Sequence, residues 1–190
     1  PFDPECFKEA AEEFCEEAGV RVLHHLLLCG CDCAPAENGS SHTRSAYFMT
    51  KNGVYQIDAK TFIDATGDAD LAACAGFETY VLPKCDIQAH SLCAIVSGWN
   101  ELQKHYGDRF SLRALLGPKG LVGLDHVFGW TAPVVGVPES KFIAVTRVAN
   151  CNPADARDLT DGLLESRRQL ARIVDAVNAN FPLPDGRRLS

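Results

Sequence analysis

At the start of the chain, hydrophobic and polar positions alternate first with the spacing of a helix and then in a short run typical of a strand. Residues 3–19 predict a helix, because apolar positions recur every three or four residues between an Asp-Pro-Glu start and a glycine stop. Residues 20–24 form a short segment rich in Val and Leu and predict a strand. Helix, glycine and strand in this order are typical of an α/β unit.

The next segment predicts an antiparallel insert. A polar turn is expected at 35–41, and an Asn-Gly turn at 51–53. These turns separate three predicted strands, at 26–33, 45–50 and 54–57. The insert is therefore a β-meander.

The second half of the chain has a different pattern. Residues 81–148 predict strands and loops punctuated by prolines, with the clearest strands at 92–96 and 142–148. A long helix is expected to open at 158–161, with an apolar stripe formed by Leu163, Leu164, Leu170, Ile173, Val174 and Val177. We place the domain boundary near 77–82, which gives domains 1–80 and 81–190.

Composition narrows the class of protein. The 190 residues are 46% hydrophobic and 23% charged, and the formal net charge is -7. We therefore expect a globular core, and no binding to nucleic acid or to a membrane. The nine cysteines contain no CxxC pair, so we interpret them as small buried hydrophobic residues in a reducing, cytoplasmic compartment and expect no metal site.

The most informative segment is residues 62–73, which read "FIDATGDADLAA". A short apolar strand at 61–64 is expected to lead through a turn of small residues into a small-residue helix at 71–75. Small side chains allow a ligand to approach the backbone closely, and a helix start offers free N–H groups to an anion or a polar cofactor edge. These residue types predict a ligand site without identifying the ligand.

The string "IDATGDADLAACAG" resembles the hallmark of the FAD-dependent oxidoreductase family, whose FAD domain is of the glutathione-reductase type and whose members typically read "DATGDGDLA". Upstream, "DPECFKEAAEEFCEEAGVRVL" is similar to the family's helix-glycine-strand unit. Downstream, "TRVANCNPADARDLTDGLLESRRQLARIVDAV" is similar to its "TRV…DLT…E…RRQ" segment.

The resemblance implies FAD as the cofactor. It implies that Ala65, Thr66 and Gly67 lie by their backbone against the adenosine and pyrophosphate half of FAD. It also gives Asp68 a structural or cofactor-adjacent role, and Asp70 the same role; the alternative for both acids is a helix N-cap. Asp64 is expected to hold the turn.

One family feature does not occur in the sequence, the phosphate-binding GxGxxG loop. Residues 117–123 contain glycines at GxxGxxG spacing, but without a preceding strand or a following helix they predict an ordinary loop. We therefore expect the 190 residues to be an internal fragment that is inactive and binds FAD weakly or not at all.

Candidates for substrate chemistry lie in the second domain. The resemblance matches Gln88 to a family glutamine and Arg147 to the family's "TR" pair, where the guanidinium could bind a substrate carboxylate. His90, two residues after Gln88, could act as an acid or base. Each has a structural alternative: a strand-end hydrogen bond for Gln88, a packing role for His90 and a domain-interface ion pair for Arg147.

The sequence thus predicts an α/β fold: part of a three-layer, Rossmann-like FAD/NAD(P)-binding domain with a β-meander insert, then part of a β-rich α+β substrate domain. The expected function is hydride or electron transfer between a small-molecule substrate and FAD. The alternatives are a flavin hydroxylase or ketoreductase with the same cofactor fold, and a non-catalytic binding module. The substrate, the electron acceptor and the oligomeric state are left open.

Overall fold

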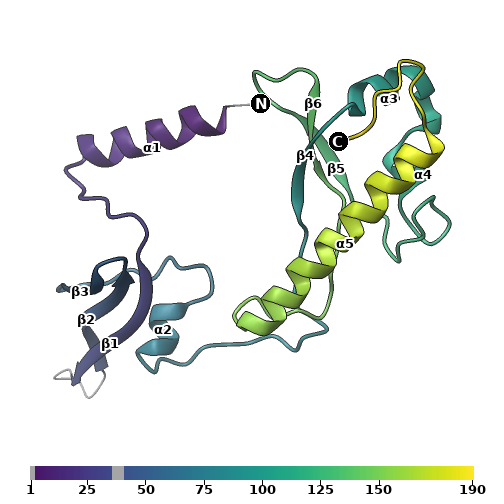
Figure 1. Cartoon of the computed structure of the whole chain (residues 1–190). Coiled ribbons are helices and arrows are strands. Elements are labelled where there is room, and N and C mark those ends of the chain that lie inside the picture. The colour runs from purple at the N-terminus through teal and green to yellow at the C-terminus, as the bar shows by residue number, and fades with distance from the viewer. Residues whose placement is uncertain (1–2, 36–40) are drawn as a thin grey trace. The chain divides into compact units, whose positions relative to one another are not determined.

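The structure is a computed structural model that describes residues 3–35 and 41–190 (Figure 1). It divides into two compact units: an N-terminal unit, Lys8–Val81, and a C-terminal unit, Leu82–Ser190 together with the first seven residues. Among the described residues, no helix is long and apolar enough to cross a membrane.

Helix α1 (Pro4–Glu17) begins and ends as the sequence predicts. Asp3 Oδ1 accepts a hydrogen bond from Glu5 N at 2.9 Å, and Gly19 takes the left-handed conformation with φ 70°. The apolar positions of the helix are not buried, however, and Phe7 and Phe14 are 62% and 72% exposed.

The predicted meander is confirmed as a three-stranded antiparallel sheet in the order β1-β2-β3. Its strands are β1 (Leu27–Pro35), β2 (Ser41–Thr50) and β3 (Gly53–Asp58). The β2–β3 hairpin turns at residues 51–52, where Gly53 has φ 116°. Strand β1 has register shifts between Leu28 and Gly30 and between Asp32 and Cys33. Most of the polar turn expected at 35–41 lies outside the described residues.

Two predicted strands are absent from the described chain. Residues 20–24 and 61–64 have no regular secondary structure and belong to neither sheet. A strand is defined by hydrogen bonds to a neighbour, and none of the described strands pairs with either segment. Most of the apolar side chains there are consequently exposed, and Ile63 is 88% accessible. Both predictions were wrong for this reason, although helix α2 (Asp70–Cys74) follows the second segment as expected.

The C-terminal unit contains a second antiparallel sheet in the order β4-β6-β5. Its strands are β4 (Cys93–Ser97), β5 (Trp130–Pro133) and β6 (Ser140–Ala144). The two strands predicted most clearly are thus present, with β6 shorter than expected. Between β4 and β5 the chain forms helices where strands and loops were predicted: α3 (Trp99–Tyr106), the 3-10 turn η1 (Gly107–Arg109) and α4 (Leu112–Leu115).

Helix signals for this region were present in the sequence. Trp99, Leu102 and Tyr106 are spaced at one helical face, and the first two are buried. Ser111 caps α4 by accepting a hydrogen bond from Ala114 N. The prolines around this region favoured a loop, and that prediction was wrong. Helices as short as these are stabilised by packing against other elements rather than by their own length, so a sequence pattern alone gives a weak signal for them.

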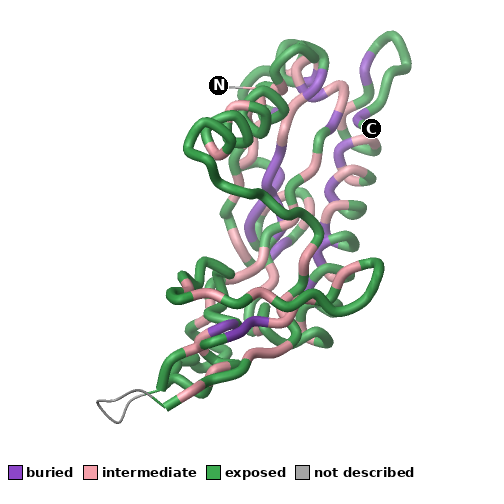
Figure 2. The backbone as a smooth tube through the Cα atoms, turned by 90° about the vertical axis from the view of Figure 1, so that its left-hand side faces the viewer, coloured by how far each residue is buried: buried purple, intermediate pink, exposed green. Residues whose placement is uncertain are grey.

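The long helix α5 (Ala156–Asn180) starts earlier than predicted. Asp155 is the N-cap, and its carboxylate accepts from Arg157 N and Asp158 N. The later part of the predicted stripe is confirmed, since Ile173 and Val177 are buried and Leu170 and Val174 pack against the core, but Leu163 and Leu164 are 39% and 41% exposed. The buried positions recur along one side of the helix (Figure 2) and are Gly162, Ser166, Gln169, Ile173 and Val177.

The hydrophobic core belongs almost entirely to the C-terminal unit. Side chains from α5, the β4-β6-β5 sheet and α3 meet there, and Trp99 and Phe110 pack with ring centroids 4.8 Å apart. In the N-terminal unit the buried residues among those described are Ser45, Ala46 and Leu71. The two units therefore differ in how much apolar surface they remove from water.

The described chain contains two antiparallel sheets and five α-helices, a mixed α/β fold compatible with part of an FAD-binding domain. The three-layer arrangement stays a prediction. The interpretation of the cysteines was wrong for most of them, because only Cys151 is buried and six of the nine are exposed.

A first prediction concerns Gly162, where α5 passes Cys151. A methyl group at Gly162 would lie 2.7 Å from Cys151 Sγ, which is fixed by a 2.6 Å hydrogen bond to Asp158 O. We expect Gly162→Ala to lower the free energy of unfolding by about 1–3 kcal/mol in chemical denaturation, although alanine is the better helix former. Asp161→Ala is the control and should be nearly neutral. Adding Cys151→Ala to Gly162→Ala should recover part of the loss; additive losses would contradict the steric explanation.

Candidate functional site

The turn between residues 64 and 70 is held together by the carboxylate of Asp64. Its Oδ1 accepts from Thr66 N at 3.1 Å and from Thr66 Oγ1 at 2.8 Å, and its Oδ2 accepts from Ala72 N at 2.9 Å. Thr66 Oγ1 accepts in turn from Asp70 N at 2.9 Å. The expectation that Asp64 holds the turn is confirmed.

These hydrogen bonds favour the charged form of Asp64. The bond from Ala72 N is the largest cause, followed by those from Thr66, and together they lower the pKa of the Asp64 carboxyl below its ordinary value. Asp64 is therefore a carboxylate at neutral pH and a permanent acceptor for the turn.

The tip of the turn offers open backbone. Gly67 and Ala69 have positive φ angles of 91° and 58°, and a Cβ built on Gly67 would meet no atom within 4 Å. Within residues 3–35 and 41–190, the N–H groups of Gly67, Asp68 and Ala69 have no hydrogen-bond partner. Three successive exposed donors on a glycine turn can receive an anionic or polar ligand edge.

The helix that follows does not offer the free N–H groups that the sequence predicted. The N–H groups of Asp70 and Ala72 bind Thr66 and Asp64, and that of Ala73 binds Ala69 O. Ala69 occupies the N-cap position without a side-chain bond, so the alternative of Asp68 or Asp70 as N-cap is wrong. Their carboxylates are exposed beside the free donors instead. The free N–H groups of this region therefore lie in the turn and not at the start of the helix.

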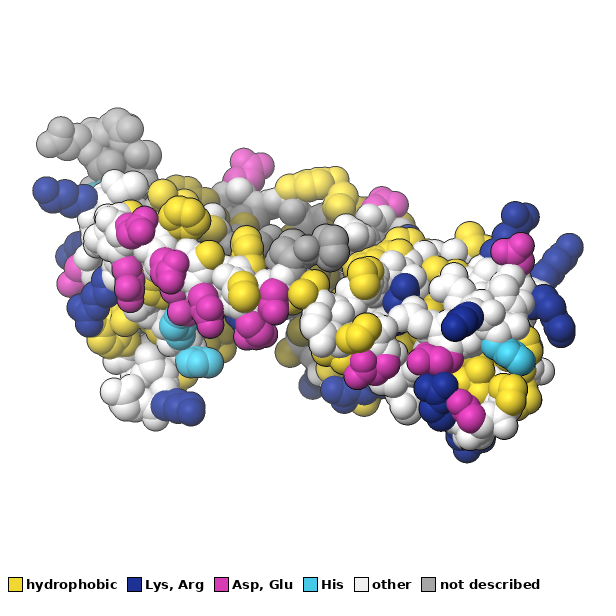
Figure 3. All heavy atoms as spheres, turned by 90° about the horizontal axis from the view of Figure 1, so that it is seen from above, with side chains coloured by type: hydrophobic (Ala, Val, Ile, Leu, Met, Phe, Trp, Pro, Cys, Tyr) yellow, Lys and Arg dark blue, Asp and Glu magenta, His cyan; other side chains and the backbone are white. Residues whose placement is uncertain are grey.

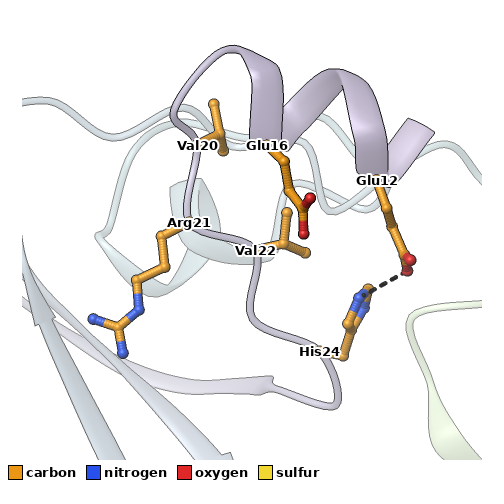
Figure 4. A pocket seen from close by; sticks show the side chains of 6 residues that line it. All are labelled: Glu12, Glu16, Val20, Arg21, Val22 and His24. Carbon is orange, nitrogen blue, oxygen red and sulfur yellow. Dashed lines mark ion pairs between the residues drawn. The ribbon is translucent and has the colours of Figure 1, made fainter. Parts of the chain in front are cut away.

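Two cavities lie in the N-terminal unit. One, of about 260 Å³, is lined by Phe62 and Phe77 together with the start of β2. The other, of about 350 Å³, lies beside α1, whose acidic side chains form a row in Figure 3. There the side chain of His24 points at Glu12, with Nε2 3.2 Å from Oε1, and Arg21 points away from both (Figure 4). The predicted site residues line neither cavity.

In the C-terminal unit, two hydrogen bonds with Gln169 hold the backbone of Arg147. Gln169 of α5 accepts from Arg147 N at 2.9 Å and donates to Arg147 O at 3.1 Å. The guanidinium is exposed and lies 5.3 Å from the centre of the Phe128 ring. Arg147 has no ion-pair partner among the described residues, so its charge is available to an anion.

The three residues predicted for substrate chemistry do not form one contact group. His90 pairs by backbone with Val148, and its Nδ1 lies 3.5 Å from the position of a Cβ on Gly162. Its Nε2 is buried and has no hydrogen-bond partner among the described residues. Gln88 is exposed and lies outside any strand, contrary to its predicted strand position. Backbone pairing with Val148 brings His90 next to Arg147 in the fold. The side chain of His90 lies near Gly162, whereas that of Arg147 lies over Phe128.

Sequence reasoning missed His126 and Gln169. Both ring nitrogens of His126 are buried without a partner in the described chain. Burial is the main cause that lowers the pKa of His126, and the nearby charge of Arg147 lowers it further. His126 is therefore a neutral imidazole close to Arg147. For His126, the only signal in the sequence is its position two residues before Phe128. Gln169 could have been found as a polar residue on the buried side of α5.

The N-terminal unit thus contains a glycine turn with open backbone donors, and the C-terminal unit contains an exposed arginine whose backbone is hydrogen-bonded to Gln169. The family described as FAD dependent oxidoreductase has a model that matches residues 1–188, and the chain belongs to this family. The resemblance drawn from the sequence is confirmed, and the cofactor of the family is FAD. No curated protein and no solved structure matches the chain.

A second prediction follows from the hydrogen bonds to Asp64. Because its folded pKa is lowered, its contribution to the turn is complete above the unfolded pKa, which is about 4. That contribution is lost as the pH falls through the folded value. In an NMR titration, the Ala72 amide signal should move only below the ordinary range of Asp, and Asp64→Asn should abolish this movement. A midpoint at the ordinary value would contradict the role of Asp64.

A third prediction concerns Gln169. Gln169→Leu removes both partners of the Arg147 backbone, and unpaired polar groups cost about 1–3 kcal/mol each. We expect the free energy of unfolding to fall by about 2 kcal/mol in chemical denaturation. Arg167→Ala, an exposed neighbour on α5, is the control and should have little effect. Equal losses for the two variants would show that the two hydrogen bonds from Gln169 do not stabilise the backbone at Arg147.

Proposed function

We propose that the protein transfers hydride or electrons between a small-molecule substrate and FAD. The observation that carries this proposal is the turn held by Asp64, in which the N–H groups of Gly67, Asp68 and Ala69 are exposed and Gly67 and Ala69 are left-handed. FAD, when bound, supplies the electron chemistry, and the chain supplies binding, orientation and charge.

For the cofactor, the residues of the turn fit a polar edge. Ala65, Thr66 and Gly67 would lie by backbone against the adenosine and pyrophosphate half of FAD, with the free donors of Gly67, Asp68 and Ala69 toward its oxygens. Thr66 cannot move independently, since its hydroxyl joins Asp64 to Asp70. In this proposal Asp68 and Asp70 flank the donors and would bind hydroxyl or amine groups rather than phosphate, because like charges repel.

For the substrate, the proposal uses the second unit. Arg147 would bind a carboxylate in the bidentate manner that a planar guanidinium permits. Its backbone is hydrogen-bonded to Gln169 on both sides, so the position from which the side chain extends is restricted before the substrate arrives. His126, a neutral imidazole, and His90 are the candidates for proton transfer, and the charge of Arg147 acts on His126.

The remaining expectations form part of the same proposal. The N-terminal unit would be part of a three-layer, Rossmann-like cofactor domain, and the C-terminal unit part of the substrate domain. The partner would be a small molecule rather than nucleic acid or a membrane, in the cytoplasm. The net charge of -7 and the six glutamates of α1 support the exclusion of nucleic acid, because an acidic surface repels a polyanion.

The fourth prediction tests the turn as the cofactor site. FAD is added to the isotope-labelled chain, and the backbone amide signals are followed by NMR, which also detects weak binding. We expect the signals of Gly67, Asp68 and Ala69 to shift with FAD and also with ADP, which carries the same adenosine and pyrophosphate groups. Riboflavin, which lacks them, should leave these signals unchanged.

Two variants control this titration. Asp64→Asn removes the acceptor that shapes the turn and should weaken the FAD-induced shifts at least several-fold. Asp108→Asn changes the same charge at an exposed position of the C-terminal unit and should leave the shifts unchanged. Shifts that riboflavin reproduces, or that are absent at saturating FAD, would count against the proposed cofactor site.

A further inference from the structure

Strand β1 and helix α2 bring together cysteines that are far apart in sequence. Cys31 Sγ lies 3.3 Å from Cys74 Sγ, across a sequence separation of 43 residues. Cys33 also faces α2, with its Sγ 3.7 Å from Ala75 O. All three thiols are free, and Cys74 is exposed while Cys31 is half-buried. No group of His, Cys, Asp or Glu side chains among the described residues could hold a metal ion.

The separation of Cys31 and Cys74 is close to what a covalent bond requires. A disulfide has its sulfur atoms about 2.05 Å apart, so the two sulfurs need to approach by little more than one ångström. Helix α2 has five residues and ends at Cys74, so a small displacement of its last turn can supply this movement. Cys29, on the same strand, does not compete, because its Sγ donates to Tyr47 O at 3.4 Å.

We propose that Cys31 and Cys74 are a reversible thiol pair, which a small-molecule disulfide such as oxidised glutathione converts into a disulfide that ties β1 to α2. The proposal is independent of the proposed function, because it uses contacts of the reduced chain alone. The pair would be a redox modification site at the end of α2, the helix that follows the turn held by Asp64.

The reaction proceeds by two thiol–disulfide exchanges. The thiolate of the exposed Cys74 attacks one sulfur of oxidised glutathione, which forms a mixed disulfide and releases one glutathione thiolate. Cys31 then loses its proton and attacks the sulfur of Cys74, which breaks the mixed disulfide and releases the second glutathione. Two protein thiols are oxidised, one small disulfide is reduced to two thiols, and the two protein protons end on the glutathione molecules.

The environment of Cys31 assigns the first step to Cys74. Burial, and next the hydrogen bond with Cys74, raise the pKa of the Cys31 thiol to about 12. Cys31 is thus protonated at neutral pH and inert toward reagents in solution. It becomes the attacking group only after Cys74 has been modified 3.3 Å away. The closure of the disulfide should therefore accelerate as the pH rises.

The disulfide would act on the turn through α2. The first residues of this helix are already bound to Asp64 and Thr66, and the disulfide would fix its last residue to the sheet. With both ends restrained, opening of the helix should become rarer. Hydrogen exchange at the Ala72 amide should slow when the disulfide forms.

The fifth prediction tests the pair on the full 190-residue chain. The reduced protein is incubated with oxidised glutathione, the remaining thiols are alkylated at intervals, and the linked peptides are mapped by mass spectrometry. We expect the Cys31–Cys74 peptide to be the first internal disulfide, and to disappear on addition of dithiothreitol. Cys74→Ser should prevent it, and Cys31→Ser should stop the reaction at a glutathione adduct on Cys74.

Cys29→Ser is the matched control, because it changes a cysteine of the same strand and should leave the Cys31–Cys74 link intact. Circular dichroism of each variant separates loss of the pair from loss of the fold, and Cys31→Ala provides a second variant without a hydroxyl. A first disulfide between Cys33 and Cys74, or one that forms no faster than links among the other exposed cysteines, would overturn the proposal.

Discussion

Backbone N–H and C=O groups that leave a helix or a strand need other partners, and in both units single polar side chains supply them. Asp64 and Thr66 do this for the turn before α2, and Gln169 does it for the Arg147 segment. Thr146 does the same at the edge of the second sheet, where its hydroxyl accepts from Leu92 N at 2.7 Å. The shape of each candidate site depends on these bonds, because neither site lies within regular secondary structure.

This arrangement separates the groups that shape a site from those that meet a ligand. Asp64 is occupied by the turn, while the N–H groups of Gly67, Asp68 and Ala69 have no partner among the described residues. In the same way Gln169 fixes the backbone of Arg147 and leaves its guanidinium exposed over Phe128. An FAD-dependent oxidoreductase needs both kinds of position, since the electron chemistry belongs to the cofactor and the protein contributes geometry.

The part of the fold that could be predicted from the sequence is the part decided by local pattern. The cap at Asp3, the glycine stop after α1 and the Asn-Gly turn that contains Gly53 each act within a few residues of the chain, and the structure has all three. The strands expected around Val22 and Ile63 failed because a strand requires a hydrogen-bonding neighbour. The apolar stripe of α5 failed at Leu163 and Leu164 because Gly162 and Ser166 face the interior, and small residues were not counted as core positions.

The sequence by itself determined the family and its cofactor, because the "IDATGDADLA" motif combines a specific order of small and acidic residues within a few positions. It also determined that Asp64 would hold the turn, since its partners Thr66 and Ala72 are close in the chain. Only the tertiary structure decided that Cys31 meets Cys74, that Gln169 clamps Arg147 and that His126 lies near that arginine. Those contacts join residues of different elements, and the packing of α2 on β1 and of α5 on the second sheet brings them together.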